Sequence, residues 1–287
     1  MKNKLVESNI KLSKNIYKQD IEELFYVYNI RKFNEKINHK NLDLISKGQN
    51  GSIFLFELND KKYILKSQKI FYDTPLILIN DKKCLLTQTA VNDLIISWIL
   101  YQEIPIFTQK YYGYYLDDDY IYFVKKYIET NMEEYIMNHL DRLNFYIIHI
   151  LCAIQMVFET KLLGYHFDLK FKNILLDKTD KEYIQYKNFK LKCYGYIPII
   201  YDCGSSLIYY DNRIIGRHIL YKNDNTNYCE KYEKFNDKIN IRDFFYRLRR
   251  QFGDNELVKE YYRNQNVSID EYFKLDIVSK YIKNMII

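Results

Sequence analysis

The chain has 287 residues, of which 48% are hydrophobic and 28% charged, and its formal net charge is +6. This composition is typical of a folded globular protein and excludes an intrinsically disordered chain. Acidic residues are interspersed among the basic ones, so no face-long basic array points to nucleic acid as a partner.

The cysteines and the apolar stretches bear on the compartment. The five cysteines are widely spaced and form no CxxC pair, which argues against a zinc site or a disulfide framework and favours a reducing environment. The N-terminus lacks the apolar region of a secretory signal. The most apolar stretch, residues 145–158, is too short to span a bilayer and is interpreted as a buried helix. We therefore expect an intracellular, cytoplasmic monomer without membrane insertion.

Hydrophobic periodicity predicts the elements of the first half of the chain. Residues 18–36 form an amphipathic helix, which either covers the following sheet or docks a partner. Its apolar face consists of Ile21, Leu24, Phe25 and Tyr28. The elements after it are mostly β-rich: a strand–turn–strand at 42–58, a strand within 59–70, a helix at 85–102, and a hairpin at 111–128 with Asp117–Asp119 as its turn.

The second half is mainly helical. Its predicted elements are helices at 131–143 and 145–160, short strands near 174–176 and 197–201, a lengthened hairpin at 177–196, a polar irregular region up to about 238, and a helix at 239–252 followed by a helical tail. Because β-rich elements precede helical ones, the pattern predicts an α+β fold that changes character near residue 127.

The stretch HFDLKFKN, His166–Asn173, is the first candidate for chemistry. Its D-x-K-x-x-N spacing alone would occur by chance in roughly one in five chains of this composition. The context makes it more specific, because the stretch lies between a long apolar helix and a short strand. A loop in such a place is where functional side chains are presented by a rigid scaffold.

Three further features lie in order around this loop. Gly48 and Gly51 lie in a strand–turn–strand, where small residues let backbone N–H groups approach phosphate oxygens. Lys66 ends a run of apolar β-structure, where an ammonium group needs an anionic partner. Asp202 follows an apolar strand and precedes Gly204, a good position for a metal ligand.

In this order the motifs resemble those of the protein-kinase superfamily, from about residue 42 to 250. The resemblance implies a bilobal kinase-like fold: a helical extension at 1–41, an antiparallel β N-lobe with one main helix at 42–126, and a mainly helical C-lobe, shortened at its end, at 127–287. More narrowly, the chain looks like the serine/threonine kinases of poxviruses and other large DNA viruses. The implied activity is phosphoryl transfer from ATP to Ser or Thr hydroxyls of protein substrates.

The resemblance implies a role for each residue. Lys66 would hold the α- and β-phosphates, and Asp202 and Asn173 would coordinate Mg²⁺, with Mn²⁺ as an alternative. Asp168 would orient the substrate hydroxyl and accept its proton. Lys170 would neutralise the γ-phosphate, and a lysine at this place suggests Ser/Thr substrates.

Further residues are implied around the nucleotide. Gly48, Gly51 and Ile53 would contact it from the glycine-containing turn and the strand after it. The acidic partner of Lys66 is expected on the 85–102 helix, with Asp93 preferred over Glu103.

Other positions concern the loop's support and its neighbours. Asp243 would anchor the backbone of the 166–173 loop, and His166 is expected to bond backbone rather than act as an acid or base. In the glycine-containing turn, Ser46 stands where the family has its first glycine. In the motif Asp202–Gly204, Cys203 stands where the family usually has Phe. An A-P-E ending is missing after Asp202, which puts the peptide-substrate platform in doubt.

Two alternatives to a protein kinase stay open. A pseudokinase that acts as an ATP-binding scaffold would fit the altered loop, although Lys66, Asp168, Asn173 and Asp202 are all present. A small-molecule kinase of the aminoglycoside or choline type would fit the missing A-P-E ending, but Lys170 disfavours it.

Phe167 generates a prediction about regulation. In many kinases an Arg here binds a phosphate on the activation loop, and Phe cannot pair with phosphate. We therefore expect activity without activation-loop phosphorylation. Phosphatase treatment of the purified protein should leave its phosphoryl-transfer rate unchanged, and a large fall in rate would contradict the interpretation.

Overall fold

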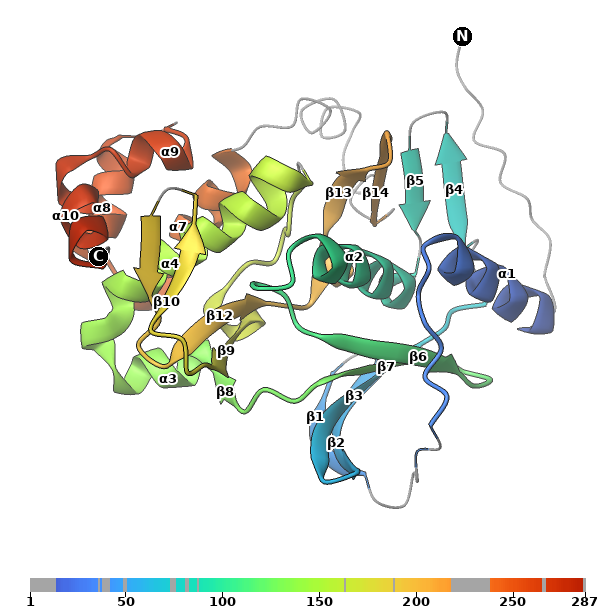
Figure 1. Cartoon of the computed structure of the whole chain (residues 1–287). Coiled ribbons are helices and arrows are strands. Elements are labelled where there is room, and N and C mark those ends of the chain that lie inside the picture. Colours follow the sequence, from blue (N-terminus) through green and yellow to red (C-terminus); the bar gives the residue numbers. More distant parts are fainter. Residues whose placement is uncertain are drawn as a thin grey trace, which may run out of the picture. The chain divides into compact units, whose positions relative to one another are not determined.

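The computed structural model describes residues 14–35, 37, 42–48, 51–72, 76–80, 83–86, 88–162, 164–187, 189–217, 238–264 and 267–285. These residues form two compact units. The first unit contains the described residues within Met1–Pro105, Gln109–Tyr127 and Asp202–Cys229, and the second those within Ile106–Thr108, Ile128–Tyr201 and Glu230–Ile287. The fold is mixed α+β with mostly antiparallel sheets, which confirms the expected class (Figure 1).

The units differ in two respects from the segments expected at 1–41, 42–126 and 127–287. The described part of the N-terminal helical extension belongs to the first unit, and so do the described residues that follow Asp202. The first unit is therefore built from segments that are far apart in the sequence.

A five-stranded antiparallel sheet belongs to the first unit, in the order β1-β2-β3-β7-β6. Its strands are β1 (Asp43–Lys47), β2 (Gly51–Leu58), β3 (Lys61–Lys69), β6 (Tyr111–Leu116) and β7 (Tyr120–Lys126). The predicted strand–turn–strand and the predicted hairpin are both confirmed. In the register of the sheet, Lys66 lies between Ile53 and Phe123, so these three side chains share one face.

Helix α2 (Thr89–Glu103) is buried along most of its length, from Ala90 to Leu100. Its apolar run explains this burial, because Ala, Val, Leu, Ile and Trp side chains occur on all its sides. The helix begins four residues later than predicted, because Lys83–Leu86 form strand β5.

A second sheet in the first unit corrects the sequence analysis. It consists of β13 (Leu207–Tyr210), β14 (Arg213–Arg217), β5 and β4 (Ile77–Asn80), in that order, with β14 parallel to β5. The expectation of irregular structure is therefore wrong up to residue 217, and residues 218–237 lie outside the described residues. Asp211 and Asn212 both have positive φ, the turn geometry that closes a two-residue hairpin.

Helix α1 (Lys14–Val27) ends before residue 36, where the prediction placed its end. Asn29 adopts a left-handed φ of 54°, and the next residues then bond to strand β6 through Phe33 N–H and Tyr114 O, 2.7 Å apart. Gly113 permits this approach, because a Cβ there would lie 2.8 Å from Phe33 N. The ring of Phe25 packs on Tyr114 at 4.5 Å, so the buried face of α1 covers part of the sheet.

The second unit contains the apolar helix expected at 145–160. It comprises α4 (Leu143–Ile154) followed by a π-helical stretch, Gln155–Lys161. Within the described residues, the helical run Leu140–Phe158 is long and apolar enough by length and composition to cross a membrane, so the expectation that it is too short is wrong. However, 72% of its apolar window is buried inside the protein, which is typical of a core helix.

Short strands and helices complete the second unit. Strands β8 (Thr130–Asn131), β9 (Ile174–Lys178) and β12 (Tyr196–Ile200) form one sheet, and β10 (Tyr183–Tyr186) and β11 (Phe189–Lys192) form the expected lengthened hairpin. The remaining helices are α3 (Met132–Asn138), α7 (Lys238–Phe252), α8 (Glu256–Arg263), α9 (Ile269–Tyr272) and α10 (Asp276–Met285).

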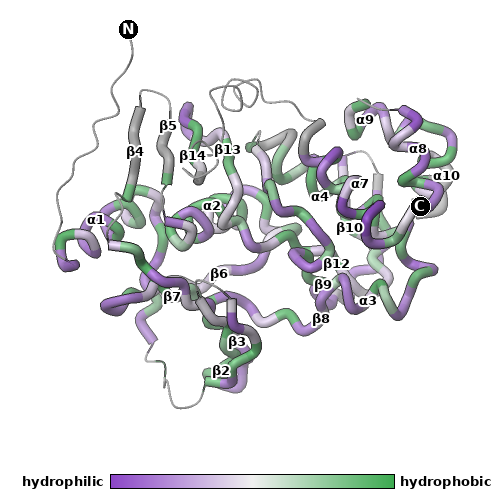
Figure 2. The backbone as a smooth tube through the Cα atoms, turned by 180° about the vertical axis from the view of Figure 1, so that it is seen from behind, coloured by the Kyte–Doolittle hydropathy of each residue, from purple (hydrophilic) through white to green (hydrophobic). Residues whose placement is uncertain are grey.

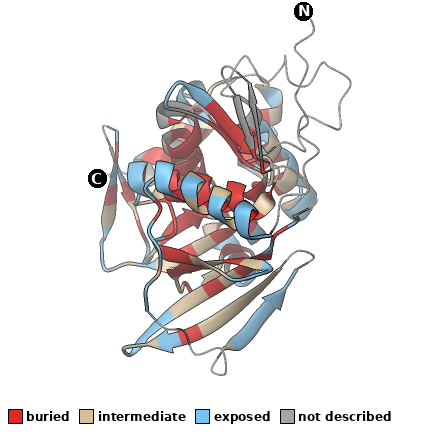
Figure 3. Ribbon diagram, turned by 90° about the vertical axis from the view of Figure 1, so that its right-hand side faces the viewer, coloured by how far each residue is buried: buried red, intermediate tan, exposed pale blue. Residues whose placement is uncertain are grey.

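The outer helices of this unit are amphipathic. Hydrophilic and hydrophobic residues alternate along α7 and α8 (Figure 2). Phe244, Phe245 and Leu248 of α7 are buried, whereas Tyr246 is exposed. Buried and exposed faces of the helices and strands can be followed in Figure 3.

His149, on α4, is a buried titratable residue away from the sequence motifs. Its Nε2–H donates to the Lys192 carbonyl of the β10–β11 hairpin at 2.9 Å, and Nδ1 is buried without a hydrogen-bond partner among the described residues. Burial lowers the pKa of His149 to about 4, because the charged imidazolium would lose its hydration.

The lowered pKa predicts a loss of stability in mild acid. The unfolded chain binds a proton on His149 near pH 6.5 and the native state does so only near pH 4, so the free energy of unfolding falls as pH drops through that window. Between pH 6.5 and 5 the loss from this residue is about 2 kcal/mol.

Urea denaturation at several pH values measures this effect. The His149→Gln variant keeps a donor for the Lys192 carbonyl but does not titrate, so its stability should fall less steeply than that of the natural chain. Equal slopes in the two proteins would refute the assignment, whatever the absolute stability of the variant.

Candidate functional site

Lys66 on β3 is the centre of the candidate site in the first unit. Its Nζ lies 2.7 Å from Asp93 Oδ2 and 2.8 Å from Asp202 Oδ1. Asp93 comes from α2 and is fully buried, whereas the Asp202 side chain is 39% exposed. The structure therefore brings together three residues expected at the site, and it contains the predicted contact between Lys66 and Asp93. We refer to these three residues as the lysine cluster.

The charges of the lysine cluster stabilise one another. Burial lowers the pKa of Lys66, but the carboxylates of Asp202 and Asp93 outweigh burial and raise it above its usual range. Burial likewise raises the pKa of Asp93, but the ammonium groups of Lys125 and Lys66 hold it below the usual range. Both groups are therefore charged at neutral pH.

Asp93 is also fixed by neutral donors. Its Oδ1 accepts hydrogen bonds from the Cys203 backbone N–H at 2.9 Å and from the Ser97 hydroxyl at 3.1 Å. A buried carboxylate whose oxygens all have donors loses little by its desolvation. Asp93 thereby links α2 to the turn that carries Asp202.

Asn92 holds the same turn and was missed by the sequence analysis. Its Nδ2 lies 3.1 Å from each of the backbone carbonyls of Cys203, Gly204 and Ser206. The only signal in the sequence is a pair of polar residues, Asn92 and Asp93, inside an apolar helical run. A buried polar pair in such a run requires partners.

The glycine-containing turn is described in part. Gly48 N–H donates to Gly51 O at 2.8 Å, and residues 49 and 50 lie outside the described residues. A Cβ at Gly51 would lie 1.9 Å from Ser67 O, so only glycine lets β2 pack this closely on β3. Ile53 is half-buried on the face of the sheet that carries Lys66.

Lys125 and Cys203 are buried near the lysine cluster. The sequence analysis did not predict that either residue would lie there. The Lys125 ammonium lies 4.5 Å from the centre of the Tyr111 ring, and burial lowers its pKa. Burial raises the pKa of Cys203 to about 12, so its thiol stays protonated. Cys203 is therefore no candidate nucleophile.

In the second unit, the loop His166–Asn173 converges on Asp168. Asp168 Oδ2 accepts from Lys170 Nζ at 2.8 Å and from Asn173 Nδ2 at 2.9 Å, and Oδ1 accepts from Arg247 at 3.1 Å. Asn173 Nδ2 also donates to the Asp168 carbonyl at 2.9 Å. The structure thus brings together Asp168, Lys170 and Asn173, and it adds Arg247 from α7, which the sequence analysis did not assign.

His166 supports the loop through backbone bonds, as expected. Its Nε2–H donates to the Tyr201 carbonyl at 2.9 Å, and its Nδ1 lies 3.4 Å from the Asp168 backbone N–H. Phe167 has a left-handed φ of 60°, and its carbonyl accepts from Arg247 at 3.3 Å.

The residue that anchors the backbone of the His166–Asn173 loop is Asn240 and not Asp243, so the assignment made from the sequence is wrong. Asn240 Oδ1 accepts from the His166 backbone N–H at 3.1 Å, and its Nδ2 donates to the Gly164 carbonyl at 2.7 Å. Asp243, one turn further along α7, instead binds Arg247 at 3.0 Å. Asn240 is the residue whose side chain is buried beside the loop, which is why it and not Asp243 reaches the backbone.

The two expected metal ligands have suitable chemistry, each within its own unit. The Asp202 carboxylate is partly exposed, and the Asn173 amide keeps its oxygen outside the two hydrogen bonds that its Nδ2 donates. Oxygen donors of this kind fit a hard cation such as Mg²⁺, which retains water and phosphate ligands. Among the described residues, no three His, Cys, Asp or Glu side chains form a metal-binding group.

Comparison with models of known protein families finds none that matches the chain, and comparison with curated proteins finds no significant match. The site is therefore interpreted from its own residues.

The correction at the loop anchor gives a prediction about stability. Asn240→Ala removes the hydrogen bonds to the His166 backbone N–H and the Gly164 carbonyl, both buried, so it should lower the free energy of unfolding by about 2–4 kcal/mol. Asp243→Ala removes a partly exposed ion pair and should cost under about 1 kcal/mol. Urea denaturation of both variants checks this order, and a larger loss for Asp243→Ala would restore the original assignment.

Proposed function

We propose that the protein is a Ser/Thr protein kinase with a bilobal kinase-like fold, which transfers the γ-phosphoryl group of ATP to protein substrates. The observation that carries the proposal is the lysine cluster, in which a strand lysine is held between a helix carboxylate and a carboxylate that follows a strand. The narrower resemblance to kinases of poxviruses and other large DNA viruses belongs to the same proposal.

The proposed mechanism gives each group of residues its own role in nucleotide binding and transfer. Asp202 and Asn173 would hold Mg²⁺, which neutralises phosphate charge when it is bound. Lys66, oriented by Asp93, donates to the phosphate oxygens.

Asp168 takes the acid–base role in this mechanism. The substrate hydroxyl oxygen bonds to the γ-phosphorus, the bond to the bridging oxygen of ADP breaks, and the hydroxyl proton passes to Asp168. Asp168 Oδ1 accepts from Arg247 at 3.1 Å, and its second lone pair would accept from the substrate hydroxyl. Lys170, whose Nζ donates to the other oxygen at 2.8 Å, would offset charge on the γ-phosphate.

A second candidate function is an ATP-binding scaffold without transfer. The observation that favours it is the contact of Asp168 with two cationic side chains, Lys170 and Arg247, and with the Asn173 amide. These contacts occupy lone pairs on both carboxylate oxygens, which a substrate hydroxyl would otherwise approach.

One assay separates the two functions. The purified protein is incubated with Mg²⁺ and γ-labelled ATP, and is offered casein, a basic protein and small alcohols. We expect label on Ser or Thr of protein substrates and a rate about 10²- to 10⁴-fold lower for Asp168→Ala. Asp180→Ala, the same change at an exposed position, is the matched control.

Each outcome has a defined meaning. Binding of ATP without transfer to any acceptor would support the scaffold and refute the kinase. Label on the small alcohols alone would assign a small-molecule kinase. Equal transfer by Asp168→Ala would show that the activity comes from a contaminant.

A further inference from the structure

A cavity of about 890 Å³ lies in the first unit. It is lined by a face of α2 other than the face that carries Asp93 of the lysine cluster. Its lining comes from the end of α1 and the segment after it, from the C-terminal half of α2, and from the β13–β14 hairpin. Trp98 and Ile99 lie about 140° and 240° around the helix axis from Asp93. The helix therefore presents Asp93 and the cavity on different faces.

The floor of the cavity is apolar. Trp98, Ile99, Ile30 and Ile215 line it and are each buried, with exposed fractions from 1% to 6%. Side chains so buried form a fixed surface. The part of this surface that faces the cavity offers apolar contacts to a bulky apolar group of a ligand.

The rim of the cavity is aromatic and basic. Tyr26 and Val27, at the end of α1, are 82% and 69% exposed, which is unusual for large apolar side chains beside a cavity. Arg31 and Arg213 are exposed, and in the part of the chain that the structure describes neither guanidinium forms an ion pair. Asp211 is the single acidic residue of the lining, so the rim carries a net positive charge.

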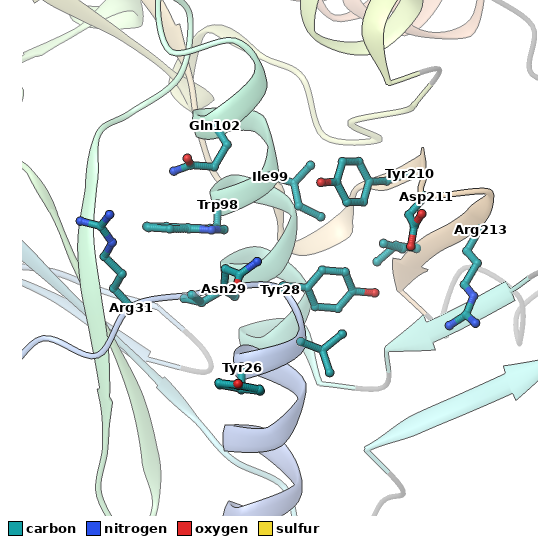
Figure 4. Close-up of a pocket in the computed structure, with 13 residues that line it drawn as sticks. Tyr26, Tyr28, Asn29, Arg31, Trp98, Ile99, Gln102, Tyr210, Asp211 and Arg213 are labelled. Carbon is teal, nitrogen blue, oxygen red and sulfur yellow. The ribbon is translucent and has the colours of Figure 1, made fainter.

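The two arginines are placed on opposite sides. In Figure 4, Arg31 lies beside Trp98 at one side of the cavity, and Arg213 lies at the other, beyond Tyr28 and Asp211. A ligand that meets both needs an acidic group at each end and an apolar group between them.

We propose that this cavity binds a peptide segment of a partner protein in which a bulky apolar side chain is flanked by acidic residues. The apolar side chain enters between Trp98 and Ile99, and carboxylates on either side pair with Arg31 and Arg213. Tyr, Trp and Arg are the residues enriched at binding hot spots. The net charge of +6 also favours the approach of an acidic partner.

The exposed rim favours a peptide over a small molecule. Small-molecule sites bury most of their ligand, whereas Tyr26 and Val27 at the rim of this cavity are largely exposed. The proposal is independent of phosphoryl transfer, because binding needs none of the residues of the lysine cluster or of the His166–Asn173 loop.

Trp98 is the only tryptophan of the chain, so intrinsic fluorescence of the intact protein reports on the cavity floor. The probe is a synthetic peptide with one Phe flanked on each side by two Glu residues. We expect a saturable change in Trp98 emission, with calorimetry giving the same dissociation constant and high salt weakening it. Peptides with Gln for Glu, or with Ala for the Phe, should bind more weakly.

Matched arginine variants locate the site. Arg31→Gln and Arg213→Gln should each weaken binding about two- to fivefold, as expected for partly exposed ion pairs, and the double variant should weaken it more. Arg242→Gln, at an exposed position on α7, is the control and should leave affinity unchanged. Urea midpoints confirm that all variants fold.

Several results would overturn the proposal. These are no binding of the acidic peptide by either method at millimolar concentration, unchanged affinity in the double arginine variant, or equal affinity for the peptide with Ala in place of Phe. Binding of phenyl phosphate without binding of the peptide would also overturn it, and would assign the cavity to a small anion.

Discussion

The ion pairs of Lys66 with Asp93 and Asp202 are the interaction on which the first unit depends most. They join a strand, a helix and the turn after a strand, and each partner comes from a different part of the chain. Removing one partner leaves a buried charge uncompensated, which costs far more than an exposed ion pair is worth. The requirement to satisfy Lys66 therefore restricts where α2 and the Asp202 turn can lie.

Each unit contains a buried asparagine on a helix that hydrogen-bonds the backbone of a loop. In both units that loop carries a candidate functional carboxylate. Asn92 of α2 binds three carbonyls of the turn after Asp202, and Asn240 of α7 binds the backbone on both sides of Tyr165. An amide suits this task because it adds no charge: Asn92 donates to its loop, and Asn240 both donates to and accepts from its own. The carboxylates of Asp202 and Asp168 are thereby positioned without being neutralised by the residues that position their loops.

The sequence alone predicts those parts of the structure that follow from local pattern. Alternation predicts the strands around Gly48 and Gly51 and the β6–β7 hairpin, and a lysine in apolar β-structure predicts a carboxylate partner, which Asp93 provides. Strands β13 and β14 were missed because they are short, although their Asp211–Asn212 turn signals a hairpin. Pairing of β14 with β5 has no local signal at all.

Long-range polar contacts were the least predictable part of the candidate site. Asp243 and Asn240 are both polar residues of α7, and the spacing of α7 alone does not tell which of them faces the loop. The contact of Arg247 with Asp168 depends on how α7 packs within the second unit. Such contacts follow from tertiary packing, which periodicity does not encode.

Phe167 and Asp202 have the same backbone feature, a left-handed φ of about 60°. Outside glycine this conformation costs on the order of 1 kcal/mol, and for a bulky side chain such as Phe it is rarer still. Selection for folding stability alone would therefore favour Gly or Asn at both positions. A version of this protein designed for stability alone would therefore be expected to replace both residues, as it would Lys187 and Tyr194, which have the same left-handed backbone.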